Sequence, residues 1–243
     1  MIPFERDKKD PCNGWVIDVG VRSYEETHAW QQSLVSLRKR GLIRDLLVIV
    51  EHPPVITLGR QTHAENLAHV DPSLPQFKVE RGGDVTYHGP GQLVCYQIFD
   101  LDARGRDLHS YMRSLEQVVI DTLKHYDVVA KRVKGLTGVW VETPDGDRKI
   151  TSIGVAAKQW ISYHGIAVNL ETDLRKFSSI NPCGLQPDVM TSLAELTGQP
   201  VDRREFSDKL VRAFSEVFAT DFTPVSLEHI AEDIKSEEGG GHV

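Results

Sequence analysis

The sequence predicts an α+β fold in which a mixed β-sheet is flanked by helices. Long stretches with helical spacing of apolar residues are separated by short β-rich apolar runs, and two of these runs are joined by a hairpin turn. No internal repeat or linker interrupts the 243 residues. We therefore expect a single domain over residues 1–243, with a polar, glycine-rich tail over 235–243 that frays.

The first half of the chain alternates helix and strand signals. Residues 23–40 predict a helix, because Ser23 and Glu26 have the spacing of a capping box and Trp30, Leu34 and Leu37 follow at helical spacing. Residues 46–59 predict two strands, since a β-rich apolar run is broken there by two prolines. A longer connecting segment is expected over 61–77.

The second half is richer in strands. Residues 92–101 predict a strand, and residues 107–126 predict an amphipathic helix. Residues 138–157 read as a hairpin around a Pro-Asp-Gly turn, and 165–171 as a further strand. The last strong signal is a helix over 202–219, with apolar residues on one face.

The composition excludes several kinds of partner. The chain carries 28 lysine and arginine residues against 35 acidic ones, a net charge of −7, so we expect no nucleic-acid partner. No apolar run approaches the ~20 residues that a membrane span needs, and the charged start lacks the apolar core of a secretory signal. We expect a cytoplasmic protein with no membrane partner.

No metal or other cofactor is expected. The three cysteines include no Cys-x-x-Cys pair, which argues against a disulfide framework and a structural zinc site. His63, Glu65 and His69 lie close together, but their spacing matches no metal motif, and we interpret them as loop or surface residues.

Cys183 is the candidate nucleophile. It lies between Pro182 and Gly184, in a loop that offers no packing reason for a thiol. Cys95, inside an apolar strand, and Cys12, near the N-terminus, are interpreted as inert.

A thiol of pKa ~8.5 is only slightly ionised at neutral pH, so a reactive cysteine needs a neighbour that favours its thiolate. The candidates are two histidines, His88 and His164, or a lysine.

A glycine-rich stretch over 81–92, RGGDVTYHGPGQ, precedes an apolar strand. Its four glycines allow backbone N–H groups to approach a ligand closely. The alternative is a turn-rich hairpin connection. The stretch is neither a P-loop nor a dinucleotide fingerprint.

Four motifs occur together in order: RGGDVTYHGPGQLV, RKITSIGV, YHGIAVNL and INPCGL. Over roughly residues 15–215 the chain closely resembles the lipoyl(octanoyl) transferases of lipoate synthesis. The resemblance implies a fold like the catalytic domain of biotin and lipoate protein ligases. It also implies that Cys183 carries the acyl group as a thioester and that Lys149 is its catalytic partner.

The resemblance further implies three acyl-binding segments. They comprise Arg81, Gly82, Gly83, Asp84, Val85, Thr86, Tyr87 and His88, then Ser152, Ile153 and Gly154, then Gly165, Ile166 and Ala167. One departure is Gln97, where many relatives have proline. Backbone amides near Gly184 or in the Gly82–Gly83 segment are candidate oxyanion donors.

A cysteine–lysine pair also makes physical sense by itself. An ammonium ~4 Å from a thiolate gains at most about 4 kcal/mol at an effective dielectric of 20, which lowers a thiol pKa by up to roughly three units. The alternative for Lys149 is a solvated residue after the hairpin turn.

The resemblance implies octanoyl-acyl carrier protein as the donor. The implied acceptors are a lysine on the lipoyl domains of 2-oxoacid dehydrogenases and on the glycine cleavage H protein. Transfer from thioester to amide is downhill, so no ATP or metal is required. Lys131, Arg132 and Lys134 are a candidate docking patch for acidic partners, or else simply solvated.

Two other functions remain open at this point. An ATP-dependent lipoate or biotin protein ligase would share the fold, but it needs no nucleophilic cysteine. A non-enzymatic lipoyl-binding module would leave the glycine-rich stretch unexplained.

Overall fold

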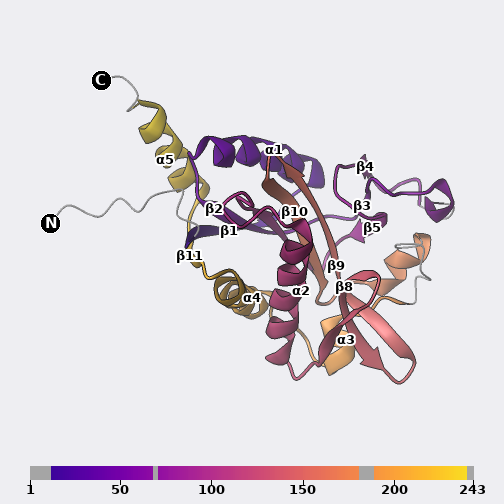
Figure 1. The fold of residues 1–243 in the computed structure, drawn as a ribbon. Coiled ribbons are helices and arrows are strands. Elements are labelled where there is room, and N and C mark those ends of the chain that lie inside the picture. The colour runs from indigo at the N-terminus through magenta and orange to yellow at the C-terminus, as the bar shows by residue number, and fades with distance from the viewer. Residues whose placement is uncertain (1–11, 68–70, 181–188, 240–243) are drawn as a thin grey trace.

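The main sheet of the computed structural model has eight strands (Figure 1). The structure describes residues 12–67, 71–180 and 189–239. In spatial order the strands are β11 (Asp221–Pro224), β1 (Asn13–Val21), β2 (Asp45–Glu51), β6 (Gln92–Ile98), β10 (Ile161–Asn169), β9 (Gly146–Lys158), β8 (Leu136–Thr143) and β7 (Ala130–Val133). β1 runs parallel to β2 and β11, and the other neighbours are antiparallel. The predicted mixed sheet is confirmed.

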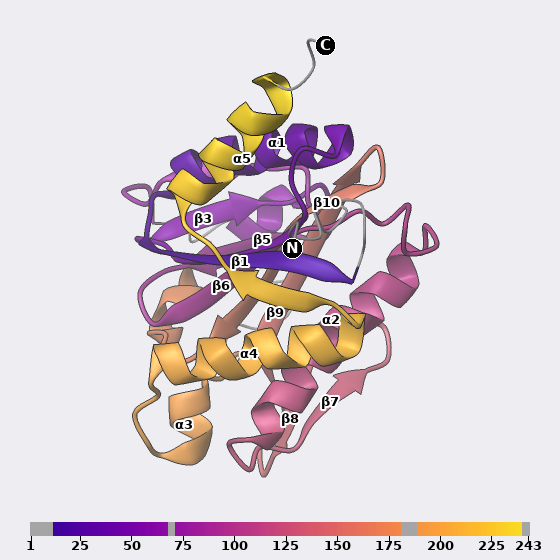
Figure 2. The same cartoon turned by 90° about the vertical axis from the view of Figure 1, so that its left-hand side faces the viewer.

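Helices cover both faces of this sheet (Figure 2). α1 (Tyr24–Arg40) and α5 (Leu227–Gly239) lie on one face, while α2 (Leu108–Lys124) and α4 (Arg203–Phe218) lie on the other. The alternation of side chains along the strands explains the two cores: in β2, Leu46 and Val48 pack towards α1, and Leu47 and Ile49 pack towards α2 and α4.

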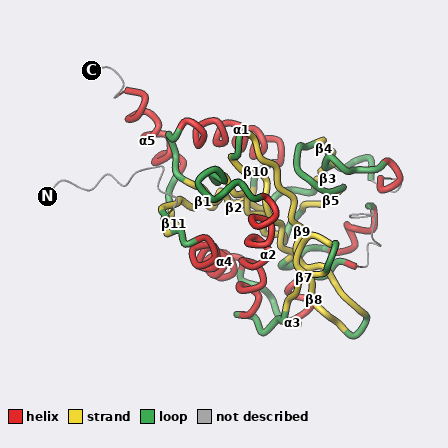
Figure 3. The backbone as a smooth tube through the Cα atoms, in the orientation of Figure 1, coloured by secondary structure: helices red, strands yellow, loops and turns green. Residues whose placement is uncertain are grey.

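A second, three-stranded sheet lies beside the first and carries the glycine-rich stretch (Figure 3). Its strands are β4 (Gln76–Lys78), β3 (Val55–Leu58) and β5 (Val85–His88). Short helices complete the fold: η1 (Ala64–Leu67), η2 (Leu174–Ser179) and α3 (Leu193–Thr197). The two strands predicted over 46–59 are therefore confirmed as β2 and β3, but they belong to different sheets.

The three predicted helices are confirmed as α1, α2 and α4, and the Ser23 side chain caps α1 by accepting from Glu26 N–H. The predicted apolar residues Trp30, Leu34 and Leu37 are half-buried and pack against the core, where Val35 is buried. The same helix also buries two polar residues that were not predicted, Gln31 and Arg38. Gln31 Oε1 accepts from the His164 main-chain N–H, and Arg38 pairs with Asp45 at 2.8 Å.

Several elements had no prediction, namely the strands β1, β4, β5, β7 and β11 and the helices η1, η2, α3 and α5. α5 continues to Gly239, through the first part of the tail predicted to fray, and fraying of that end stays a prediction. Within the described part of the chain, no helix combines the length and apolar character needed to cross a bilayer.

Candidate active site

A cavity of about 930 Å³ lies between the main sheet and the glycine-rich loop of the small sheet. Thirteen of the fourteen residues predicted to bind the acyl group line it. Tyr87 does not, because it points to the other side of β5 and its ring packs edge-on against Phe177 at 5.5 Å. Three segments far apart in sequence thus meet around one space, and their acyl-binding role stays a prediction.

Lys149 lines the same cavity from β9. Its side chain is buried, with 4% of the residue exposed, so the alternative of a solvated lysine is wrong. The Nζ atom lies 5.6 Å from the centroid of the Trp140 ring, on the neighbouring strand β8. An ammonium over the face of an indole is attracted by the ring's quadrupole, so Trp140 helps to hold the amine in the cavity wall.

Gly138 makes room for that lysine. Its φ is +119°, and a Cβ there would lie 2.4 Å from Thr151 O and 2.7 Å from Lys149 Cε. The Gly138 N–H is fixed by donation to Glu116 Oε1 at 3.2 Å. Sequence reasoning missed this residue, although a glycine inside a strand is a known signal of close approach.

The main chain of Lys149 holds the segment that follows the cysteine loop. Its carbonyl accepts from Thr191 N–H at 3.0 Å, and Lys149 forms a parallel bridge with Met190. Cys183, with its neighbours Pro182 and Gly184, lies outside the described residues. Its role therefore stays a prediction; the described chain resumes at Val189, next to the residue that pairs with Lys149.

Arg81 holds the glycine-rich loop against the small sheet by hydrogen bonds. Its guanidinium donates to the carbonyl and hydroxyl oxygens of Thr57, each at 2.9 Å, and to Asp84 O at 2.7 Å. Because Arg81 is buried and these donors are already engaged, its first effect is to shape the loop that lines the cavity.

Glycines allow this loop and the cavity strands to approach one another. Gly82 N–H donates to Val155 O at 2.9 Å, so this amide is already used and does not serve as the predicted oxyanion donor. A Cβ at Gly154 would lie 2.9 Å from Arg81 Cδ. At Gly165 it would lie 2.3 Å from both Cys95 O and Gln97 Oε1, so a side chain would push β10 away from β6.

The two histidines considered as thiol activators are buried and neutral. Burial lowers the pKa of His88 to about 3, and its Nδ1 is paired with Gln92 Oε1 at 2.7 Å. Burial, and then the neighbouring His28, lower the pKa of His164 to about 3. An imidazole with such a low pKa is a weak base at neutral pH, so these two residues are poor activators.

The other cysteines differ in exposure. Cys95 is fully buried in β6, and burial raises the pKa of its thiol to about 12. Its predicted inertness is therefore supported. Cys12 is exposed.

Several cavity residues were not named from the sequence, because they come one at a time from separate elements. They include the apolar Val94, Met112, Leu136 and Trp140. His63 and Glu65 are exposed at the cavity edge, and His69 lies outside the described residues.

The predicted basic patch is partly neutralised within the protein. Lys131 pairs with Glu142 and Asp147, both at 2.8 Å. Arg132 pairs with Glu116 at 3.0 Å. An acidic partner would have to compete with these contacts for two of the three basic side chains.

Known proteins resemble this chain in sequence and in fold. Residues 23–215 match the family model of the lipoyl protein ligase A/B catalytic domain. An octanoyltransferase of Syntrophotalea carbinolica is 44% identical over 84% of this chain and 93% of its own length. That of Solibacter usitatus is 47% identical over 80% of this chain and 88% of its own.

Solved structures share the fold at low sequence identity. A bipartite lipoate protein ligase from Thermoplasma acidophilum, studied with its E2 lipoyl domain, superposes with a TM-score of 0.67 at 18% identity, covering 92% of this chain and 91% of its own. A lipoate-protein ligase A bound with ATP gives 0.65 at 17% identity, covering 92% of each chain. The fold, the family model and the close relatives agree: this chain belongs to the lipoyl protein ligase A/B catalytic-domain family, and within it to the octanoyltransferases, which are acyltransferases that serve protein lipoylation.

Proposed function

We propose that octanoyl transfer by this chain proceeds through a thioester on Cys183, with octanoyl-acyl carrier protein as the donor and a lysine of a lipoyl domain as the acceptor. The observation that carries the proposal is Lys149, buried in the wall of a cavity made by the three segments predicted to bind the acyl group. A buried lysine facing a ligand-sized cavity is typical of a functional group with an altered proton affinity.

In the first transfer the Cys183 thiolate attacks the carbonyl carbon of the donor thioester. A new C–S bond forms, the bond to the carrier's sulfur breaks, and the leaving thiolate takes a proton from the Lys149 ammonium. Before this step the ammonium stabilises the thiolate of Cys183, which lowers its pKa.

In the second transfer the acceptor lysine attacks as a neutral amine. A C–N bond forms and the bond to Cys183 sulfur breaks, which regenerates the thiolate. Lys149, now neutral, takes the proton that the attacking amine loses. Lysine suits both roles because its pKa shifts readily on burial, whereas arginine stays protonated.

The cavity fits an acyl chain in size and lining. About 930 Å³ lies within the range of roughly 300–1,000 Å³ that is usual for small-molecule sites. Six methylenes of an octanoyl chain at ~0.8 kcal/mol each would contribute about 5 kcal/mol of binding free energy. Val94, Met112 and Ile153 are among the apolar side chains that line the space.

The acceptors we propose are the lipoyl domains of 2-oxoacid dehydrogenases and the glycine cleavage H protein. Support comes from the lipoate protein ligase that shares this fold and was studied with an E2 lipoyl domain. We place the reaction in the cytoplasm, in keeping with the sparse cysteine content.

The decisive test is intact-protein mass spectrometry after incubation with octanoyl-acyl carrier protein. We expect one octanoyl adduct, lost in Cys183→Ser and discharged by added lipoyl domain. A wild-type enzyme that octanoylates the lipoyl domain without ever carrying the adduct would overturn the covalent route.

The competing function is an ATP-dependent ligase, since an ATP-bound ligase shares the fold. Incubation of the enzyme with ATP, free octanoate and lipoyl domain separates the two. We expect no octanoylated lipoyl domain without the carrier-bound donor, and product formation there would favour the ligase.

A further inference from the structure

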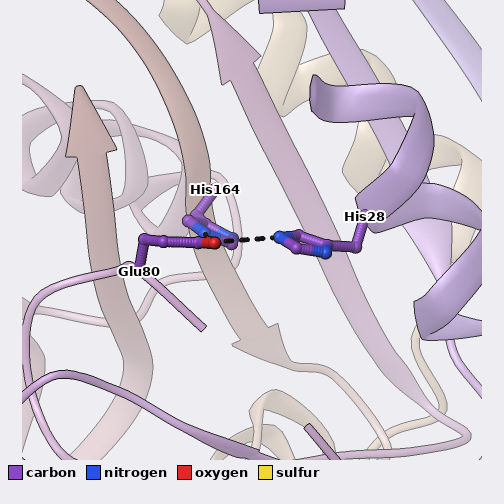
Figure 4. Close-up of side chains that lie close together, drawn as sticks. All are labelled: His28, Glu80 and His164. Atoms are coloured by element: carbon purple, nitrogen blue, oxygen red, sulfur yellow. Dashed lines mark hydrogen bonds and ion pairs between the residues drawn. The ribbon is translucent and has the colours of Figure 1, made fainter. Parts of the chain in front are cut away.

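Two histidines and a glutamate from three separate elements converge at one place, and none of the three has a role in the transfer proposed above (Figure 4). His28 comes from α1, Glu80 from the loop between β4 and β5, and His164 from β10. His28 Nε2 lies 3.2 Å from Glu80 Oε2, and His164 Nε2 lies 3.7 Å from the same oxygen. All three ligand atoms lie within 4.8 Å of one another.

His164 is the member that points to a ligand. It is 2% exposed, and within the described part of the chain its Nε2 has no hydrogen-bond partner. Buried polar side-chain atoms are nearly always paired, so an orphaned ring nitrogen needs an explanation. Its main-chain N–H is fixed by Gln31 Oε1 at 2.7 Å, and its φ is +59°, so the backbone holds this ring in an unusual direction.

We propose that His28, Glu80 and His164 form a binding site for one divalent transition-metal cation of the zinc class. Ligand atoms around tetrahedral zinc lie about 3.3 Å apart, given metal–ligand bonds near 2.0–2.1 Å. The pair formed by His28 and Glu80 already has this spacing, and small side-chain rotations would bring His164 Nε2 to it. The cation would then satisfy the orphaned nitrogen.

The donor set decides the class of cation. Two imidazoles and one carboxylate suit zinc, cobalt and nickel, whereas magnesium and calcium prefer sites made only of oxygen. The Glu80 carboxylate adds a negative charge to this donor set.

The position of the site predicts what a bound cation does. It would join α1, the start of the glycine-rich loop and β10, and both Arg81 and His164 line the cavity. We expect the cation to stiffen that wall of the cavity, while the transfer chemistry stays with Cys183 and Lys149. The site is therefore tested by metal binding, whose outcome is independent of whether octanoyl transfer proceeds as proposed.

The test is a titration of the chelator-treated full chain with Co²⁺, followed by its visible absorption and by competition with Zn²⁺. We expect one equivalent of Co²⁺ to give the strong absorption of a tetrahedral site, and Zn²⁺ to displace it. His28→Ala and Glu80→Gln should each weaken Co²⁺ binding by at least about tenfold, the lower end of the losses caused even by outer-shell substitutions.

A matched control removes a histidine elsewhere. His109 is exposed on α2, so His109→Ala should leave the affinity unchanged. Circular dichroism of the metal-free variants shows whether they fold. Wild-type affinity in folded His28→Ala and Glu80→Gln would overturn the proposal. So would the absence of binding to the wild type at roughly 10⁻⁴ M Co²⁺, the tighter end of the range in which extracellular Ca²⁺ modules bind their cation.

Discussion

Two buried basic side chains of this protein have opposite surroundings. Arg38, 2% exposed, pairs with Asp45 at 2.8 Å, and the same carboxylate accepts from Arg104 at 2.8 Å. Lys149, 4% exposed, lies against the Trp140 ring in the wall of a cavity. The first cation is held inside an ion-paired network, and the second faces space that a substrate can enter.

The difference teaches where charge is fixed and where it can change. A guanidinium stays protonated in proteins, and a buried carboxylate makes its position rigid. A lysine amine can lose its proton, and an aromatic ring attracts the ammonium without supplying a formal charge. The Arg38 network is therefore structural, and the Lys149 site is suited to chemistry.

The largest expected effect comes from Lys149→Ala. Octanoyl transfer should fall by about 10²–10⁴-fold at pH 7, the usual contribution of a positioned acid or base. Lys149→Arg keeps the charge and should not restore the rate, because arginine cannot give up its proton. Steady-state transfer to a lipoyl domain measures both, and full activity of either variant would contradict the assigned role.

Asp45→Asn tests the other side of the comparison. It leaves Arg38 buried without its main charge partner, which should lower the free energy of unfolding by about 3–5 kcal/mol. Urea denaturation measures this loss. The rate per folded molecule should stay near that of the wild type, and a specific loss of transfer in the folded variant would break the distinction between the two regions.

Gly138→Ala tests the space around Lys149. The new Cβ would meet Thr151 O and Lys149 Cε, at a φ of +119°, so we expect a loss of about 1–3 kcal/mol and slower transfer. Gly146→Ala is the matched control, since its φ is +109° but nothing lies within 4 Å of the new Cβ. Equal effects of the two changes would show that backbone conformation alone explains the result.

The last prediction concerns acid. His52 donates from Nδ1 to Arg22 O and accepts at Nε2 from Tyr96, and burial lowers its pKa to about 4. The unfolded chain, with a pKa near 6.5, then binds more protons, so stability present above pH 6.5 is lost as pH falls towards 4. In His52→Gln this uptake of a proton on unfolding is lost. The free energy of unfolding should then depend less steeply on pH, by up to about 1.4 kcal/mol per pH unit. Urea titrations from pH 7 to 4 measure it, and an unchanged slope would contradict the burial argument.

The sequence predicted the elements with strong periodicity or punctuation. α2 and α4 each present a regular apolar face, and the Pro-Asp-Gly sequence indicates the turn between β8 and β9. α1 was found by its cap and its apolar spacing, but its buried polar residues were not, because Gln31 and Arg38 depend on partners from β10 and β2. Short edge strands such as β11 and β7 carry too few residues for a pattern.

The candidate site was predictable where its residues are contiguous. The segments that contain Arg81, Gly154 and Gly165 could be named, and thirteen of fourteen residues line the cavity. Trp140 and Gly138 were missed because their importance comes from packing against Lys149 across the strand pair. The cluster of His28, Glu80 and His164 was invisible for the same reason, since its members are separated by dozens of residues.

The engagement of Arg81 has a consequence for engineering. Because its guanidinium is bound to Thr57 and Asp84, substitutions of Arg81 would disrupt the glycine-rich loop itself and would not simply change which acyl chain is preferred. Attempts to redesign the enzyme for longer or shorter fatty acyl donors should keep Arg81 as scaffold and vary the apolar wall, for example Met112 and Ile153.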